Sequence, residues 1–278
     1  MKYTSKMLLV VCVSLLVAAT AQADIVTVQQ GVSGYAGTDD NSVWAHQNGG
    51  TDVQGDNNYG GRNYTFLGDP FGGVTGVPGG EGKGLLRFDL SNEISTLQSV
   101  SGISLTFKES GNSTSRGTGT INIYRIAAAN SAWVEGVNQA AAATGESTWK
   151  NLAHPGTAWA GSVGLGTAGT DYVNTLLGSF TFDNTQGATY TVDLATGDAA
   201  LRLSLIQEWS GTQANNAGLL FVIDGASTNP KGGLSLASSE DGTASFRPKL
   251  EVDYVVPEPA TMSLLGIGGL LALVRRKR

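Results

Sequence analysis

Short runs in which apolar and polar residues alternate recur along the middle of the chain, and this pattern constrains the fold most strongly. In the run from Leu85 to Leu90, Leu86 and Phe88 fall on one face of a strand and Arg87 falls on the other. The same period of two recurs at residues 103–108, 179–182, 190–194 and 249–254. Strands that are apolar on one face need a second sheet to cover that face. The pattern therefore predicts an all-β protein built as a β-sandwich.

One stretch, from Thr196 to Gly211, does not follow this period and is compatible with a strand or a helix. Thr196 as a cap, Asp198 in the first turn and a long run without β-branched residues favour a helix. The sequence thus predicts one short helix that closes an end of the sandwich with Trp209 buried.

Two further spans are predicted from composition. The run from Gly218 to Asp224 is apolar almost throughout, which is typical of a central strand covered on both faces. The glycine-rich spans 31–61 and 68–84 are predicted to be long loops rather than strands.

The first 23 residues have the three parts of a secretory leader. Two lysines precede an apolar run from Met7 to Ala19, and Ala21 and Ala23 then form a small-x-small pattern before Asp24. We expect signal peptidase to remove residues 1–23. The single cysteine of the chain lies in this leader, so neither disulfides nor a thiolate metal site are expected in the exported domain.

The other end of the chain has the character of a membrane segment. Residues 260–274 carry no charge and, as a helix, would be about 22 Å long at ~1.5 Å per residue. Four cations follow, at Arg275, Arg276, Lys277 and Arg278, and such residues stay on the cytoplasmic side. The sequence predicts a C-terminal transmembrane helix that holds the body of the protein outside the inner membrane, with a buried core helix as the alternative.

The tail also carries a short motif ahead of its apolar segment. Pro257, Glu258 and Pro259, followed by the apolar run and the basic end, resemble the PEP-CTERM sorting signal of Gram-negative bacteria. This resemblance places a sorting domain at residues 256–278. It implies transient insertion in the inner membrane, cleavage by exosortase, and release or attachment at the cell surface, often in species that make extracellular polysaccharide.

The exported part is strongly acidic once both ends are removed. Of the 17 Lys and Arg residues 11 remain, and of the 23 Asp and Glu residues 22 remain, which gives a net charge near −11. This balance argues against nucleic acid and anionic membrane surfaces as partners.

Eight segments occur in a particular order along the domain from residue 24 to residue 255. They are residues 57–61, 66–68, 85–91, 121–126, 132–136, 147–151, 206–221 and 238–254. In this order they resemble the DNRLRE family of surface modules, which is close to a family of carbohydrate-binding modules. The resemblance implies a jelly-roll-like β-sandwich and, in some members, polysaccharide binding; it does not imply catalysis. Insertions near residues 139–143 and 161–175 depart from the family pattern.

Catalytic signatures are sparse, so we predict no catalytic residues. The two histidines, His46 and His154, are far apart in the sequence, and no serine sits in a nucleophile-elbow motif. Glu135 and Glu146, each near a tryptophan, leave open a polysaccharide lyase or glycosidase with a carboxylate pair. The alternative is that each carboxylate caps a turn or pairs with an arginine.

Hard oxygen donors gather in the first glycine-rich span. Asp39, Asp40, Asp52 and Asp56, with neighbouring asparagines, suit a structural Ca²⁺ ion, although their spacing matches no EF-hand. Solvated turns are the alternative explanation for these residues.

Aromatic residues are the remaining candidates for ligand binding. Sugars stack their C–H faces on aromatic rings, and Trp44, Tyr59, Tyr64 and Trp159 lie in polar, glycine-rich surroundings. We predict that these four form a sugar platform, whereas the other three tryptophans, Trp133, Trp149 and Trp209, belong to the core. The expected function is polysaccharide binding at the cell surface or in the extracellular matrix, with a ligand-free structural protein as the alternative.

Overall fold

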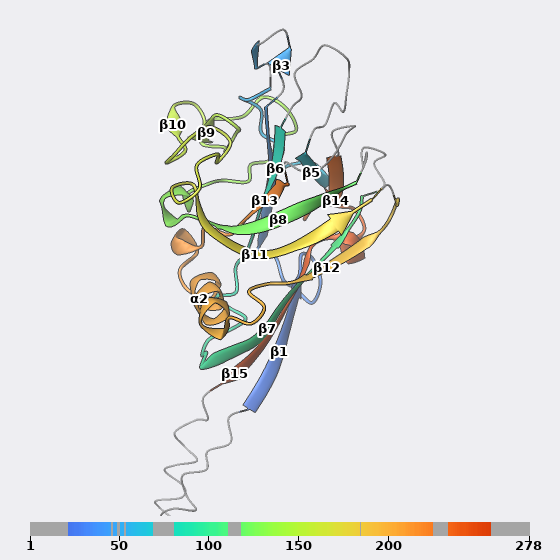
Figure 1. The fold of residues 1–278 in the computed structure, drawn as a ribbon, viewed down its shortest axis with the longest axis vertical. Coiled ribbons are helices and arrows are strands. Elements are labelled where there is room, and N and C mark those ends of the chain that lie inside the picture. Colours follow the sequence, from blue (N-terminus) through green and yellow to red (C-terminus); the bar gives the residue numbers. More distant parts are fainter. Residues whose placement is uncertain are drawn as a thin grey trace, which may run out of the picture.

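The computed structural model describes residues 22–45, 47–48, 51–52, 54–68, 81–110, 118–183, 185–224 and 233–256. About 45% of these described residues are in strands, and within them one α-helix accompanies the sheets (Figure 1). Two antiparallel sheets share a core, so the predicted all-β sandwich is confirmed. Residues 1–21 of the leader and residues 257–278 of the tail lie outside the described residues.

The smaller sheet has four strands in the order β1–β15–β7–β12. It joins the first described strand to the last one, because β1 pairs along its whole length with β15. Its strands are β1 (Gln22–Gln29), β15 (Lys249–Val256), β7 (Ser99–Lys108) and β12 (Thr189–Asp193).

The larger sheet has seven strands in the order β11–β8–β13–β6–β5–β14, and β2 also pairs with β6. Its strands are β11 (Tyr172–Phe182), β8 (Gly119–Ile126), β13 (Leu219–Ile223), β6 (Glu81–Phe88), β5 (Tyr64–Gly68), β14 (Gly233–Ala237) and β2 (Thr38–Ala45).

Minor elements occupy the connections. Two short strand pairs are β3 (Gln47–Asn48) with β4 (Thr51–Asp52), and β9 (Asn151–Ala153) with β10 (Thr157–Ala158). Single 3₁₀ turns are η1 (Ala128–Asn130), η2 (Gln213–Asn215) and η3 (Ala244–Phe246). β3 lies at one end of the long axis, and β1 and β15 reach toward the opposite end (Figure 1).

The main core lies between the two sheets and is built from the alternating residues of the sequence. Leu86 and Phe88 of β6 face Leu105 and Phe107 of β7, and all four side chains are buried. Phe107 packs edge-on against Phe221 of β13, with 5.4 Å between ring centres. The period-two prediction for these strands is therefore confirmed.

β13 is a central strand, as predicted, because both of its faces are covered. Leu219 and Phe221 belong to the core between the sheets, whereas Leu220 belongs to a second apolar cluster on the outer face of the larger sheet. The long connection from residue 127 to residue 171 folds over that outer face and supplies Trp133, Trp149 and Trp159 to the cluster. Burial of Trp133 and Trp149, together with Trp209 in the main core, confirms the three predicted core tryptophans.

The helix prediction is confirmed, but the predicted cap is wrong. α2 spans Ala199–Trp209 and contacts β7, and Trp209 is buried. Asp198, rather than Thr196, is the N-cap: its carboxylate accepts a hydrogen bond from the backbone N–H of Leu201 at 2.9 Å. Thr196 instead directs its hydroxyl at the carbonyl of Asp193 in the preceding turn.

The loop prediction for residues 31–61 is wrong over Thr38–Ala45, which form β2. The side chains of β2 are mostly polar, so the strand has no hydrophobic pattern in the sequence. Several of these side chains are nevertheless buried, because other segments supply hydrogen-bond partners. The Asn41 amide donates to the carbonyl of Ser147, and the Ser42 hydroxyl accepts from the backbone N–H of Phe66. In the second span, residues 81–84 also belong to a strand, β6, and residues 69–80 lie outside the described residues.

Candidate functional site

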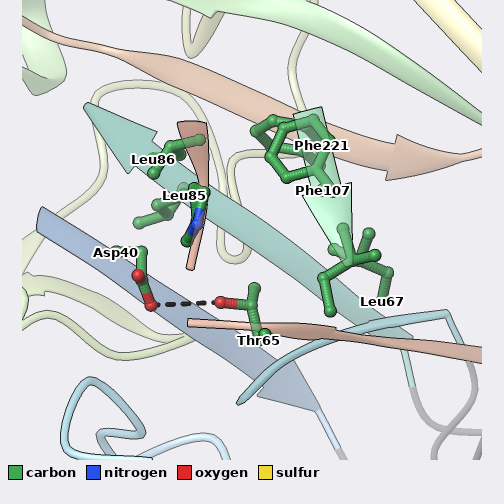
Figure 2. A pocket seen from close by; sticks show the side chains of 10 residues that line it. Asp40, Thr65, Leu67, Leu85, Leu86, Phe107 and Phe221 are labelled. Atoms are coloured by element: carbon green, nitrogen blue, oxygen red, sulfur yellow. Dashed lines mark hydrogen bonds between the residues drawn. The ribbon is translucent and has the colours of Figure 1, made fainter. Parts of the chain in front are cut away.

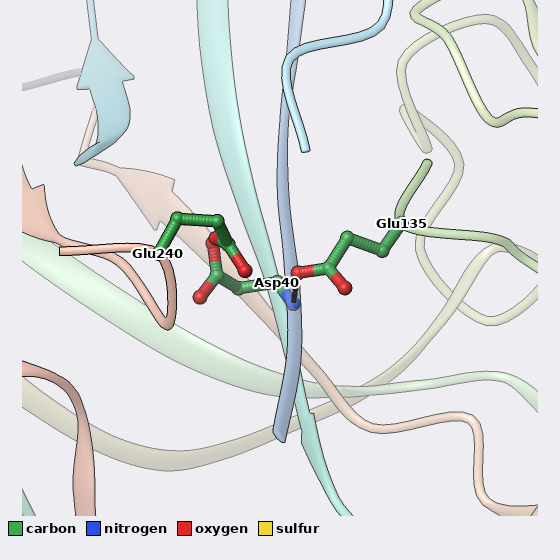
Figure 3. A group of neighbouring side chains, drawn as sticks. All are labelled: Asp40, Glu135 and Glu240. Atoms are coloured by element: carbon green, nitrogen blue, oxygen red, sulfur yellow. Dashed lines mark hydrogen bonds between the residues drawn. The ribbon is translucent and has the colours of Figure 1, made fainter. Parts of the chain in front are cut away.

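Three carboxylates from distant parts of the sequence meet beside the larger sheet. Asp40 belongs to β2, Glu135 to the connection after η1, and Glu240 to the loop between β14 and β15. One oxygen of each lies within 4.8 Å of the other two. Figure 3 shows Glu135 and Glu240 approaching Asp40 from opposite sides. We call these three residues the carboxylate cluster.

Hydrogen bonds fix the geometry of the carboxylate cluster. The backbone N–H of Asp40 donates to Glu135 Oε1 at 2.7 Å, and the backbone N–H of Ser239 donates to Asp40 Oδ2 at 2.6 Å. The Ser239 hydroxyl lies 2.5 Å from Glu240 Oε1 and 3.3 Å from Glu135 Oε1. The Thr65 hydroxyl donates to Asp40 Oδ1 at 3.1 Å. Two loops and two strands are thereby joined at one point.

The carboxylate cluster holds protons more tightly than free carboxyl groups do. Burial, and then the charge of Glu240, raises the pKa of Asp40. Burial, and then the charges of Asp40 and Glu240, raises the pKa of Glu135, and burial also raises the pKa of Glu240. Carboxylates that share a buried site cannot all be charged, so the cluster takes up protons or an external cation.

A small cavity lies beside Asp40 inside the sandwich. It measures about 20 Å³, which is room for one water-sized molecule. Figure 2 shows Asp40 bonded to Thr65 at one side and Leu67, Phe107 and Phe221 at the other. The apolar lining adds to the low-dielectric surroundings that raise the pKa of Asp40.

Arg62 organises an aromatic cluster that contains three of the predicted platform residues. Its guanidinium carbon lies 4.4 Å from the ring centre of Tyr59, 4.9 Å from that of Trp44 and 5.5 Å from that of Tyr64. The guanidinium also donates to the Tyr64 hydroxyl at 2.8 Å and to the carbonyl of Gln139 at 3.3 Å. Phe66 packs edge-on against Trp44, with 5.3 Å between ring centres. We call Arg62 and these four rings the Arg62 cluster.

The four predicted platform residues do not form one exposed face. Trp44 and Tyr59 are 5% and 2% exposed, so their rings are packed and cannot stack on a sugar. Tyr64 is half-buried and reaches the surface beside Arg62. Trp159 lies apart, in the cluster on the outer face of the larger sheet, because its indole N–H donates to the carbonyls of Thr148 and Trp149 at 3.0 and 3.1 Å.

The four aspartates predicted to hold calcium are also dispersed. Asp39 pairs with Arg87 at 2.7 Å, and Asp56 pairs with Lys150 at 2.9 Å. Nothing is described of the Asp52 side chain. Of Asp39, Asp40 and Asp56, only Asp40 joins other acids, since alternation along β2 turns Asp39 and Asp40 to opposite faces.

The two glutamates considered as a catalytic pair have different surroundings. Glu146 accepts hydrogen bonds from the backbone of Val137 and Ala143 and from the Asn138 amide, at 3.0, 2.8 and 2.6 Å. Burial by itself would raise the pKa of Glu146, but these hydrogen bonds lower it. Glu146 thus caps a turn, whereas Glu135 belongs to the carboxylate cluster. Of the two histidines, His46 lies outside the described residues, and His154 Nδ1 is 4.0 Å from Asp56 Oδ1.

Sequence reasoning missed Glu240 and Arg62 as parts of these two sites. Glu240 lies about 200 positions after Asp40, and only strand pairing brings the two together. Arg62 had a local signal, because it stands between Tyr59 and Tyr64 in a short glycine-rich segment.

Comparison with known protein families decides the nature of the C-terminus. Residues 255–278 match the PEP-CTERM protein-sorting motif. The match includes all seven predicted motif residues and begins at Val255, within β15. No curated protein matches the chain.

The PEP-CTERM motif implies that the chain is exported and processed by exosortase, and that its C-terminus acts as a sorting signal and anchor. The predicted transmembrane helix at 260–274 falls within the motif and outside the described residues. Within the described part of the chain, no helix has the length and apolar character needed to span a membrane.

Proposed function

We propose that the exported domain is displayed at the cell surface or in the extracellular matrix, where it binds polysaccharide without cutting it. The observation that carries this proposal is the Arg62 cluster, in which two buried rings position a guanidinium beside the half-buried Tyr64 ring. Resemblance of the domain to DNRLRE modules and the PEP-CTERM motif support the same assignment.

The exposure of each side chain in the Arg62 cluster defines the surface that is available to a sugar. Trp44 and Tyr59 lie behind Arg62 and set its position, so the groups available to a sugar are the half-buried Tyr64 ring, the Arg62 guanidinium and the exposed Asn63. A sugar ring stacks its C–H face on an aromatic ring and offers hydroxyls to amide and guanidinium donors. The predicted four-residue platform is thereby reduced to one ring and its polar neighbours.

Affinity electrophoresis of residues 24–256 on gels containing neutral and acidic polysaccharides tests this function. Wild type is expected to be retarded on at least one polysaccharide, and Tyr64→Ala to lose most of that retardation. Phe246→Ala serves as the control, because Phe246 is 37% exposed and belongs to η3, outside the Arg62 cluster. Equal mobility of wild type across the whole panel would instead support a ligand-free structural protein.

A glycosidase or lyase remains the rival function, and Glu135 is the residue that favours it. A carboxyl group with a raised pKa is suited to general acid catalysis. This rival requires that wild type releases reducing ends or unsaturated products and that Glu135→Gln abolishes the release.

We also propose that a structural Ca²⁺ ion would bind at the carboxylate cluster, in which Asp40 is the one member taken from the four aspartates predicted from sequence. Carboxylate and hydroxyl oxygens are the ligands that Ca²⁺ prefers, and Ser239 and Thr65 add hydroxyls to the three acids. Millimolar Ca²⁺ is then expected to raise the melting temperature above that in chelator, and Asp40→Asn to abolish the difference. An identical melting temperature in Ca²⁺ and in chelator would show that protons alone neutralise the cluster.

A further inference from the structure

The two ends of the domain that are processed during export are strand partners. In the β1–β15 pair, Gln22 faces Val256, Ala23 faces Val255, and Asp24 faces Tyr254. The PEP-CTERM motif begins at Val255, so its first two residues are the ones that pair with Gln22 and Ala23.

The leader cut falls inside this pair. The small-x-small pattern places signal-peptidase hydrolysis at the bond between Ala23 and Asp24, with water supplying the new carboxylate of Ala23 and the new amine of Asp24. Gln22 and Ala23 therefore leave with the leader. The residues from Asp24 to Gln29 keep their partners, Tyr254 to Lys249.

Little else in the described structure pairs with the end of β15. On its other side β15 pairs with β7, and that register ends where Val255 faces Ser99. After the leader is cut, Val255 is paired on one side only, and Val256 has no strand partner among the described residues.

From Tyr254 toward the core, β15 keeps its pairing with β1 after the leader is cut. Tyr254 is only 7% exposed and belongs to the core between the sheets, and its hydroxyl lies 3.5 Å from Asp24 Oδ2. Val252 and Leu250, which follow on the same face of β15, are fully buried. The rest of the strand therefore stays in place. Its last two residues lose their β1 partners: Val255 keeps Ser99 opposite and the hydrogen bond that the Gln98 N–H donates to its carbonyl at 2.9 Å, and, within the described part of the chain, Val256 keeps only side-chain packing against the core.

We propose that removal of the leader uncovers the start of the PEP-CTERM motif, so that signal-peptidase cleavage precedes exosortase cleavage and accelerates it. Proteases bind their substrates as extended, unpaired chain, and a paired strand has to open before it can enter an active site. In the precursor, β1 holds Val255 and Val256 in the sheet. The leader cut removes this restraint from the residues that lead directly into Pro257, Glu258 and Pro259.

Pulse–chase labelling of the full precursor, in a host that has exosortase, measures the rate at which the C-terminal tail is lost. Ala23→Leu blocks the leader cut, because the residue before that bond must be small. Tail loss is expected to become about tenfold slower, which corresponds to 1.4 kcal/mol.

A second pair of variants separates strand pairing from retention of the leader. In the first, Ala-Gln-Ala is inserted after Ala21 and Ala23 becomes Val, so that the leader is removed but the mature chain still begins with residues 22 and 23. In the matched control, the same insertion is followed by Gly-Pro in place of Gln22-Ala23, because proline cannot donate a ladder hydrogen bond. The first variant is expected to lose its tail about as slowly as the uncut precursor, and the control at the wild-type rate.

Equal rates of tail loss in these two variants would overturn the proposal, and so would a wild-type rate in Ala23→Leu. Mass spectrometry of the wild-type N-terminus is a third check, since a mature chain that begins at Gln22 or earlier also overturns it. Melting curves of the secreted variants confirm that each one is folded.

Discussion

The guanidinium carbon of Arg62 lies 4.4 Å from the centre of the Tyr59 ring, and the Tyr59 ring in turn lies 4.3 Å from that of Trp44. A cation thus covers two neighbouring rings, tilted by 31° to each other, that are almost completely buried. Because a partly desolvated guanidinium on an aromatic face contributes more than an exposed one, this contact stabilises the loop between the short β4 strand and β5 as well as preparing a surface.

Truncation of Arg62 should therefore destabilise the domain as well as weaken any sugar binding. We expect Arg62→Ala to lower the free energy of unfolding by about 1–2 kcal/mol, since cation–π contacts and two hydrogen bonds are lost. Urea unfolding of residues 24–256 measures the change. Lys150→Ala is the control: its ion pair with Asp56 is half-exposed and should be worth less than about 1 kcal/mol. Equal effects of the two substitutions would show that the stacking of Arg62 adds no stability.

The carboxylate cluster makes the stability of the domain depend on pH. Burial and neighbouring charge raise the pKa of Asp40 from 3.8 to about 8 in the folded protein. A raised folded pKa gives stability that is fully present below the unfolded pKa and is lost as pH rises through the folded pKa. In chelator, we expect the melting temperature to fall as the pH rises from about 4 to about 8, with a loss of up to about 1.4 kcal/mol in unfolding free energy per pH unit.

Asp40→Asn tests this dependence, because a neutral side chain has no proton to lose. The variant should show a flatter profile than wild type over the same pH range. Asp183→Asn is the matched control. Asp183 is exposed and hydrogen bonds from Thr185 lower its pKa, whereas burial raises the pKa of Asp40. A wild-type slope in Asp40→Asn would show that the carboxylate cluster does not control the profile.

The N-cap of α2 gives a prediction with a natural control two residues away. Asp198 accepts the backbone N–H of Leu201, whereas the Thr196 hydroxyl makes only a 3.4 Å contact with a carbonyl. Asp198→Ala should cost about 1 kcal/mol of unfolding free energy, and Thr196→Ala less than half of that. A larger loss in Thr196→Ala than in Asp198→Ala would restore the cap that the sequence suggested. Chemical denaturation of both variants under one condition decides between them.

The sequence predicted the strands whose apolar residues alternate, because one-sided burial leaves a period of two. Leu105 and Phe107 of β7 and Leu250 and Val252 of β15 are buried as that period requires. The same reasoning failed for β2, where Asn41 and Ser42 are buried but bonded to other segments. A buried polar strand has no hydrophobic pattern, since its stability comes from partners that are distant in sequence.

The candidate sites were predicted less well for the same reason. Composition selected Asp40 among four aspartates, but it could not pair Asp40 with Glu240, because only the sheet places β2 beside the loop that follows β14. Trp44 and Trp159 occur in glycine-rich, polar segments, yet both side chains are buried. Local polarity therefore did not indicate exposure. Trp44 is covered by Tyr59, Phe66 and Arg62, and Trp159 is buried because the long connection from residue 127 to residue 171 folds back over the sheet.

The carboxylate of Asp171 holds the connection from residue 127 to residue 171 in its fold. Asp171 accepts backbone N–H groups from Gly161, Ser162 and Thr167 at 2.7, 2.9 and 2.9 Å, and the Asn130 amide lies 3.2 Å from it. Burial by itself would raise the pKa of Asp171, but these hydrogen bonds lower it. The stability that the group contributes is therefore present at neutral pH and is lost as pH falls through its folded pKa.

Asp171→Asn keeps the shape of the side chain but replaces one accepting oxygen with an NH₂ group that faces N–H donors. We expect a loss of about 2–3 kcal/mol in unfolding free energy at neutral pH, because buried donors are left without an acceptor. The loss should shrink in acid, where wild-type Asp171 is itself protonated. Asp193→Asn is the control, because Asp193 is exposed at the end of β12 and should change the unfolding free energy by less than about 0.5 kcal/mol. A loss that is the same in acid and at neutral pH would mean that the charge of Asp171 does not hold this loop.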